Sequence, residues 1–227
     1  MNPMTAFGVA AIAVVSITSH EAAHGFMADR LGDPTARERG RLTLNPIPHI
    51  DLFFTILLPL FLILSGSSFI FGGAKPVPVD VTRLRNPRRD WALVGAAGPG
   101  LNVLIAISLT AVLSAATLMG LADTSSSLTE ILAVGIFLNA LLAVFNLIPI
   151  PPLDGSRIVQ YFLSGEALIL YRRIEQFGLI IILALVFLVP QLQVPLSRAI
   201  FGLVELITLP FGVTADVAPL LRRLLFG

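Results

Sequence analysis

The chain has 227 residues, of which 56% are hydrophobic and only 13% are charged, and its formal net charge is +1. A soluble domain of this length carries about 25% charged residues, so the composition predicts an integral membrane protein and gives no electrostatic basis for binding nucleic acid. The absence of cysteine excludes disulfides and thiolate metal sites, so a metal ion must be held by His, Asp, Glu or backbone oxygen.

Apolar stretches of about 20 residues are candidates for helices that span the membrane. The short polar segments between them contain no internal repeat. We therefore expect an all-α polytopic membrane protein with a single domain over residues 1–227 and about five to six transmembrane helices. The stretches cover residues 4–29, 52–71, 91–119, 128–148 and 175–190, with a weaker one at 197–213.

The first stretch carries three ionisable side chains, His20, Glu21 and His24, within "SHEAAHGF". Residues four apart share one face of a helix, so both imidazoles can reach one ion, with Glu21 beside it. H-E-x-x-H on a helix is the arrangement in which two histidines bind zinc and the glutamate is the general base. The alternative is a polar patch satisfied by neighbouring helices. A charge at membrane depth costs about 2.5–3.5 kcal/mol and zinc binding contributes on the order of 10 kcal/mol, so the pattern favours the metal.

The second stretch, 52–71, is flanked on both sides by Lys and Arg, which gather in cytoplasmic loops. It contains Pro59 and a Ser-Gly-Ser-Ser cluster at 65–68, either of which can break a helix. We expect a re-entrant hairpin that returns to the side it entered from; the alternative is an ordinary kinked span. The flanking basic residues are Arg30, Arg37, Arg39, Arg41, Lys75, Arg83, Arg85, Arg88 and Arg89.

Short β-strands are expected on either side of this hairpin, at "GRLTL" (40–44) and "KPVPVDV" (75–81). Prolines alternate with Val77 and Val79, so one strand edge lacks N–H groups and the other keeps them. This favours an open edge to which a substrate adds as a strand. The alternative is a rigid proline-containing loop at the headgroups.

A catalytic zinc site needs a third protein ligand and one open position. Asp154 is the first candidate and His49 the reserve. Asp154 follows the prolines that end the fourth long stretch, in "FNLIPIPPLDGSRI", and could also be the N-cap of a helix that starts near Ser156. The side chains can meet only if the chain crosses the membrane an even number of times between them. The stretches at 91–119 and 128–148 supply two crossings, so this geometry also favours re-entry of the second stretch.

Three blocks in this order resemble the site-2 protease family of intramembrane zinc metalloproteases, in its compact prokaryotic form. The resemblance covers about residues 10–165 and implies a catalytic core at about 4–165, followed by C-terminal helices at about 170–227. By position it implies that His20, His24 and Asp154 bind one zinc ion. The blocks are "HEAAHGFMADRLGDPTARERGRLTLNPIPHID", "GGAKPVPVDVTRLRNPRRDWALVGAAGPGLN" and "FNLIPIPPLDGSRI".

The same resemblance implies further roles near the zinc. Glu21 matches the catalytic base, and Asn102 and Asn146 match positions that hold the substrate backbone or the developing oxyanion. An amide suits that task because it donates and accepts without charge, although an interhelical hydrogen bond is the other common use of Asn in membranes. His49 lies in a matching block and is a candidate for the active-site entrance.

The implied activity is the cutting of a transmembrane protein within or at the edge of the bilayer, as in regulated intramembrane proteolysis. The substrate would be a membrane-anchored regulator such as an anti-sigma factor, and the enzyme a multi-pass protein of the cell membrane with its site toward the cytoplasm. The alternative is a metal-ion carrier or channel, because intramembrane His and Asp beside a proline-broken helix also suit transport. A carrier, however, has no need for Glu21.

Overall fold

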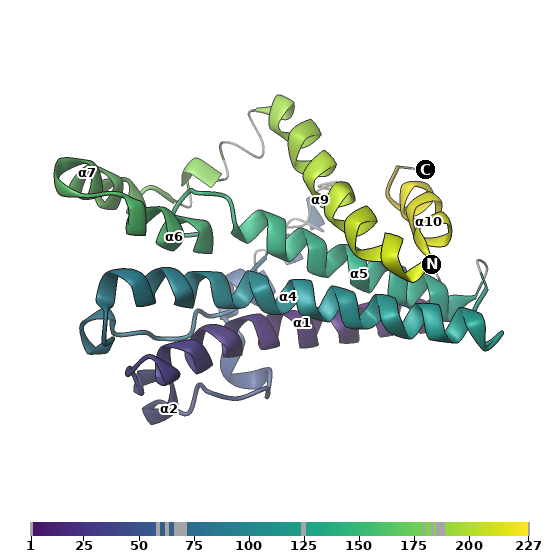
Figure 1. The fold of residues 1–227 in the computed structure, drawn as a ribbon, viewed down its shortest axis with the longest axis horizontal. Coiled ribbons are helices and arrows are strands. Elements are labelled where there is room, and N and C mark those ends of the chain that lie inside the picture. The colour runs from purple at the N-terminus through teal and green to yellow at the C-terminus, as the bar shows by residue number, and fades with distance from the viewer. Residues whose placement is uncertain are drawn as a thin grey trace.

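Three long helices form the centre of the molecule: α1 (Pro3–Arg30), α4 (Pro87–Leu118) and α5 (Ser127–Asn146) (Figure 1). They pack against one another and confirm three of the predicted stretches. The computed structural model describes residues 2–57, 60–61, 64–65, 72–123, 126–178, 180–182, 184 and 189–226.

The long helices begin where the sequence supplies caps. The Asn2 side chain accepts the N–H of Thr5 ahead of α1, and the Ser126 side chain accepts the N–H of Thr129 ahead of α5. Such bonds satisfy N–H groups that the helix leaves without partners. α4 begins at Pro87, whose missing N–H costs nothing in the first turn.

Shorter elements connect the long helices and extend the bundle. α6 and α7 lie at the end of the bundle that also holds α2 (Figure 1). The elements are α2 (Thr35–Glu38), η1 (Ile47–His49), η2 (Leu52–Leu57), η3 (Val81–Arg83), α6 (Asp154–Phe162), α7 (Gly165–Glu175), η4 (Pro190–Leu192), α9 (Gln193–Thr208), η5 (Leu209–Phe211) and α10 (Thr214–Phe226).

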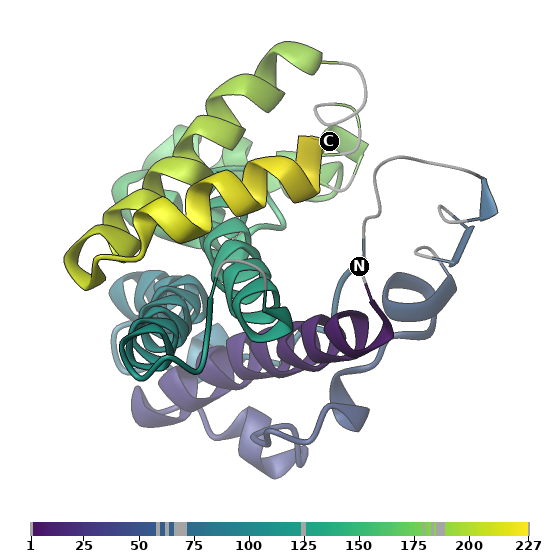
Figure 2. The same ribbon diagram turned by 90° about the vertical axis from the view of Figure 1, so that its right-hand side faces the viewer.

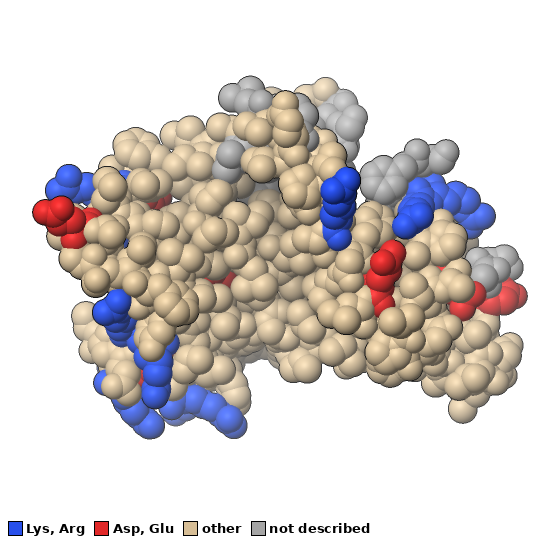
Figure 3. All heavy atoms as spheres, turned by 45° about the horizontal axis from the view of Figure 1, so that its top comes forward, with Lys and Arg blue, Asp and Glu red and all other residues tan. Residues whose placement is uncertain are grey.

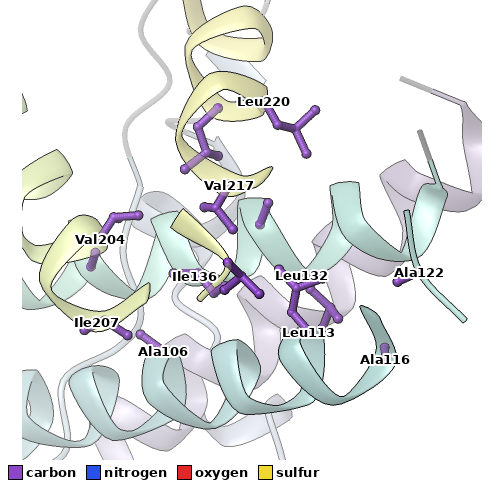
Figure 4. Close-up of a cluster of buried hydrophobic side chains, with 14 of the residues drawn as sticks. Ala106, Leu113, Ala116, Ala122, Leu132, Ile136, Val204, Ile207, Val217 and Leu220 are labelled. Carbon is purple, nitrogen blue, oxygen red and sulfur yellow. The ribbon is translucent and has the colours of Figure 1, made fainter. Parts of the chain in front are cut away.

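The hydrophobic core lies between α4, α5, α9 and α10. In Figure 2, α5 separates α1 from the pair α9 and α10, and α5 contacts all three helices. Figure 4 shows side chains from the four core helices pointing into one cluster. Its members include Leu113, Leu132, Ile136, Val204, Val217 and Leu221. This packing fixes α5, and the chain that leaves its end, against the rest of the bundle.

Four helices are long and apolar enough to cross a membrane: Pro3–Arg30, Pro87–Leu118, Ser127–Asn146 and Gln193–Phe211. Figure 3 shows charged side chains gathered toward the two ends of one face, with much of its middle uncharged. An all-α membrane protein is therefore confirmed. The predicted stretches 52–71 and 175–190 fall partly outside the described residues, so the total of five to six spans stays a prediction.

The two flanks of the expected hairpin lie together. The Lys75 N–H donates to the His49 carbonyl at 2.8 Å, and the Arg85 N–H donates to the Leu31 carbonyl at 3.0 Å. The chain thus leaves and returns at the same place, with no net crossing between α1 and α4. This agrees with re-entry, although part of the hairpin itself lies outside the described residues.

The β-strands expected at 40–44 and 75–81 are not formed; both ranges are described, and neither contains a strand. Their backbone groups have taken other partners. The Arg41 side chain donates to the carbonyls of Lys75 and Pro76, and the Val77 N–H donates to the Glu21 carboxylate. The Asp80 N–H donates to the buried Asp33 carboxylate at 2.7 Å. Residues 75–80 are thus an extended segment held by side chains rather than by a neighbouring strand.

Replacement of Leu113, which is fully buried between helices, tests the core. We expect Leu113→Ala to lower the free energy of unfolding by about 2–5 kcal/mol, because it removes apolar contacts and leaves a cavity. The matched control is Leu104→Ala on the same helix, where the side chain is 58% exposed. Denaturation of the purified protein in mixed micelles, followed by circular dichroism, measures both; equal losses would contradict this core.

Candidate metal and catalytic site

Three side chains from two distant parts of the chain meet inside the bundle. His20 Nε2 and His24 Nε2 lie 3.1 Å apart, and Asp154 Oδ2 lies 3.1 Å from the first and 3.2 Å from the second. All three residues are buried. Among the described residues, they form the one group of His, Asp or Glu side chains that could hold a metal ion. Ligands at about 2.0–2.2 Å around a tetrahedral ion lie roughly 3.3–3.6 Å apart, a little more than the observed spacing.

The hydrogen bonds of the two imidazoles determine which ring nitrogen faces the cluster as an acceptor. His24 Nδ1 lies 2.7 Å from the Val94 carbonyl, which can only accept, so this nitrogen carries the hydrogen. His20 Nδ1 lies 2.6 Å from Asn102 Oδ1 and donates in the same way. In the neutral rings both Nε2 atoms therefore carry a lone pair and no hydrogen. They lie next to a carboxylate oxygen, which is also an acceptor, so this group of three acceptors is stable only with a cation or a proton among them.

Asp154 is the first residue of α6, and Leu153 occupies the N-cap position without a side-chain bond, so the N-cap interpretation of Asp154 is wrong. Its two oxygens are divided between tasks. Oδ1 pairs with Arg157 at 3.1 Å, while Oδ2 faces the imidazoles and makes no hydrogen bond. The Arg157 guanidinium favours the ionised form of this carboxyl and fixes the direction in which Oδ2 points.

Two glycines make the approach possible. A Cβ on Gly98 of α4 would lie 2.5 Å from His24 Nε2 and 2.7 Å from His20 Nε2. A Cβ on Gly155 would lie 2.2 Å from the Leu147 carbonyl oxygen, so α6 can start against the end of α5 only with glycine there. The orphaned carboxylate oxygen and the space beside Gly98 both fit a metal ion held by two imidazoles and one carboxylate.

Glu21 lies one residue after His20 on α1 and outside the cluster. Its Oε2 accepts the Val77 N–H at 3.0 Å, so the extended segment 75–80 passes over this carboxylate. Val77 is buried in this contact. The N–H of Val79 has no partner among the described residues, and Val79 lines a cavity of about 430 Å³ with Pro78, Thr35 and Arg39.

The remaining predicted site residues lie apart from the cluster or behind it. Asn102 is fully buried and uses both ends of its amide, on His20 and on Asn139, so it is not open to a substrate. Asn146 donates to the Leu142 carbonyl of its own helix. His49 is buried, with Nε2 3.0 Å from the Thr43 carbonyl, and is not brought to the cluster.

Four positioning residues were missed by the sequence analysis: Gly98, Arg157, Asn139 and Asp33. Asn139 had a visible signal, because it is an amide in the middle of the apolar stretch 128–148. Arg157 stands three residues after Asp154, a spacing that places both on one helix face. Gly98 acts by allowing the two histidine rings to approach α4, and Asp33 acts by accepting the Asp80 N–H. Neither contact is predicted by the neighbouring sequence.

Comparisons with known proteins find relatives that are named as metalloproteases. The sequence profile described as "Peptidase family M50" matches residues 115–189. The chain is 39% identical to "Putative zinc metalloprotease YwhC" of Bacillus subtilis over 175 residues, 76% of each chain. The chain belongs to peptidase family M50. It is also 34% identical to the Mycobacterium tuberculosis protein named "Putative zinc metalloprotease Rip2", over 79% of this chain and 66% of that protein.

Membership of family M50 confirms the resemblance to the site-2 proteases and the prediction of a metalloprotease. A third relative, from Mycolicibacterium smegmatis and also named Rip2, is 29% identical over 82% of this chain and 70% of its own length. No solved structure matches the chain significantly.

Two glycines on α4 give a matched pair for testing the metal site. Gly98→Ala places a methyl group against both Nε2 atoms, whereas Gly100→Ala meets nothing within 4 Å. We expect Gly98→Ala to weaken zinc binding by at least about tenfold and Gly100→Ala to leave it unchanged. Competition against a chelator of known affinity measures both. Full zinc affinity in folded Gly98→Ala protein would contradict the assigned site.

Proposed function

We propose that this chain is an intramembrane zinc metalloendopeptidase that hydrolyses peptide bonds within or near the transmembrane segments of membrane proteins. The observation that carries the proposal is the meeting of His20, His24 and Asp154 beside Glu21, on a helix long enough to span a membrane. His20, His24 and Asp154 would hold one zinc ion through Nε2, Nε2 and Oδ2. Two imidazoles and a carboxylate with an open fourth position are a ligand set of catalytic zinc.

Zinc bound there would polarise the scissile carbonyl and bring the pKa of water down to about 7. Glu21 is our candidate for the general base. It would take the proton of the attacking water and deliver it to the nitrogen of the leaving amine. The Val77 N–H holds one of its oxygens, so the carboxylate is oriented before a substrate arrives.

The extended segment 75–80 is our candidate for holding an unwound substrate. A peptide bond in an α-helix is wrapped by side chains and its carbonyl is engaged, so hydrolysis requires local unwinding. The Val79 N–H has no partner among the described residues, and Val79 lines the 430 Å³ cavity, so this N–H can donate to a carbonyl of an extended peptide. The Val77 N–H is taken by Glu21, which corrects the expectation that both valines offer open donors.

Asn146 remains our candidate for binding the substrate backbone. It lies at the C-terminal end of α5, before the turn that leads to Asp154. Its amide is half-buried, and its hydrogen bond to a described residue is the one to Leu142, so we take its oxygen and second hydrogen as the groups that would bind a peptide. His49 stays a candidate for the entrance only, since its buried Nδ1 has no partner within the described chain and its backbone anchors Lys75.

We place the enzyme in the cell membrane with its site toward the cytoplasm. The basic residues from Arg30, which ends α1, to Arg89 in the first turn of α4 lie at the end of α1 that carries the cluster, which supports this orientation. The proposed substrate class is a transmembrane protein, for example a membrane-anchored regulator of the anti-sigma type. The rival, a metal-ion carrier, gives no account of Glu21 beside the cluster.

Replacement of the base separates the two functions. Glu21→Gln keeps the shape of the side chain and an oxygen for the Val77 N–H but cannot take a proton. We expect peptide hydrolysis to fall by about 10²- to 10⁴-fold while zinc content stays at that of the wild type. Cleavage of a reporter transmembrane helix in proteoliposomes and elemental analysis measure the two quantities. Unchanged cleavage would sink the proposed role, and zinc transport by both forms would favour the carrier.

Proline substitutions test the two valines separately. Val79→Pro removes the free donor, so we expect kcat/KM to fall about 2- to 12-fold through KM, the value of one hydrogen bond. Val77→Pro removes the bond to Glu21, so we expect the loss to appear mainly in kcat. Val79→Ala, which keeps the N–H, is the control. Zinc content should be normal in all three, and an unchanged KM in Val79→Pro would refute the substrate contact.

A further inference from the structure

A series of buried hydrogen bonds runs from His20 into the bundle. His20 Nδ1 lies 2.6 Å from Asn102 Oδ1 on α4, and Asn102 Nδ2 donates to Asn139 Oδ1 on α5 at 2.9 Å. Asn139 Nδ2 then donates to Ser16 Oγ on α1 and to the Gly135 carbonyl, both at 2.9 Å. These hydrogen bonds therefore link all three long helices, and the two asparagines have no exposed surface.

The Gly135 carbonyl determines which group donates and which accepts in each of these hydrogen bonds. The Gly135 carbonyl can only accept, so the NH₂ group of Asn139 must face it and Asn139 Oδ1 must face Asn102. Asn102 therefore presents its NH₂ group to Asn139 and its oxygen to His20. Because Asn102 Oδ1 can only accept, His20 Nδ1 must carry the hydrogen. His20 Nε2 then has a lone pair, which faces His24 and Asp154.

We propose that Asn139 is a positioning residue that selects the metal-binding tautomer of His20 through Asn102. The inference rests on the proposed zinc site but concerns a side chain that touches neither metal nor substrate. His24 needs no such relay, because its Nδ1 donates directly to the Val94 carbonyl. The partner of His20 Nδ1 is a side-chain amide, and an amide can rotate to present either end.

Loss of Asn139 frees that rotation. Without an acceptor at Asn139 Oδ1, Asn102 can turn its NH₂ group toward His20 Nδ1. That NH₂ group stabilises the tautomer with a lone pair on Nδ1 and a hydrogen on Nε2. An Nε2 that carries a hydrogen cannot bind zinc. The expected outcome is a change of tautomer at one histidine and a weaker metal site in a protein whose helices are intact.

The test compares three variants by ¹⁵N NMR of the histidine rings, with the whole chain in detergent micelles. The chain has three histidines, which keeps the spectra simple. At alkaline pH without zinc, we expect a protonated Nδ1 at His20 in the wild type and a large unprotonated fraction in Asn139→Leu. Asn139→Asp should restore the wild-type pattern, because a buried, neutral carboxyl keeps an acceptor toward Asn102 and an O–H donor toward the Gly135 carbonyl.

Two controls isolate the relay from general damage. His24 should keep its tautomer in every variant, because its partner is a backbone carbonyl. Thr110→Val removes another buried hydrogen bond of α4, from Thr110 Oγ1 to the Ala106 carbonyl, and should leave His20 unchanged. In competition with a chelator, we expect the Kd for Zn²⁺ to rise about 10- to 100-fold in Asn139→Leu and to stay within about twofold in the control.

The outcomes are distinct. A protonated His20 Nδ1 in folded Asn139→Leu would overturn the inference while leaving the zinc site in place. An equal change in the tautomer of His20 in Thr110→Val would also overturn it, because the loss of any buried hydrogen bond would then have the same effect. Failure of the wild type to bind zinc would instead contradict the proposed function, and the tautomer of His20 in the zinc-free protein would still decide the role of Asn139.

Discussion

The meeting of His20 Nε2, His24 Nε2 and Asp154 Oδ2 within 3.2 Å of one another is the constraint on which the rest of the structure depends. Three acceptors without a donor repel one another unless a cation or a proton lies between them. The fold brings them together by running out along α4 and back along α5, so that α6 starts against α4 at the level of Gly95. The tight contact of Gly155 with the end of α5 completes that return.

A second layer of residues directs each member of the cluster. Arg157 pairs with Oδ1 of Asp154, and the Val94 carbonyl accepts from Nδ1 of His24. Asn102 accepts from Nδ1 of His20 and is itself held by Asn139. Outside the cluster, Asp33 and Arg41 hold the extended segment that carries Val77 to Glu21. The base and the ligands are thus oriented by separate parts of the chain, and damage to one need not disturb the other.

Most of the helices and the cluster could be predicted, because their signals are local. Long apolar runs gave the positions of α1, α4 and α5, and the spacing of His20 and His24 indicated a shared ion. The strands at 40–44 and 75–81 were wrong because alternation predicts strand character, while strand formation needs a neighbour that only the fold provides. The alternative role of Asp154 as an N-cap was wrong because Leu153 holds that position, while the carboxylate contacts His20 and His24, which are far away in sequence.

The most direct test of this account is X-ray absorption at the zinc edge on the purified protein. It predicts one zinc ion per chain with two imidazole nitrogens at about 2.0–2.1 Å and a carboxylate oxygen at about 2.0–2.2 Å. It also predicts that the imidazole scattering is lost when both histidines are replaced. A protein that carries no zinc, or zinc whose surroundings do not change in that double variant, would contradict it.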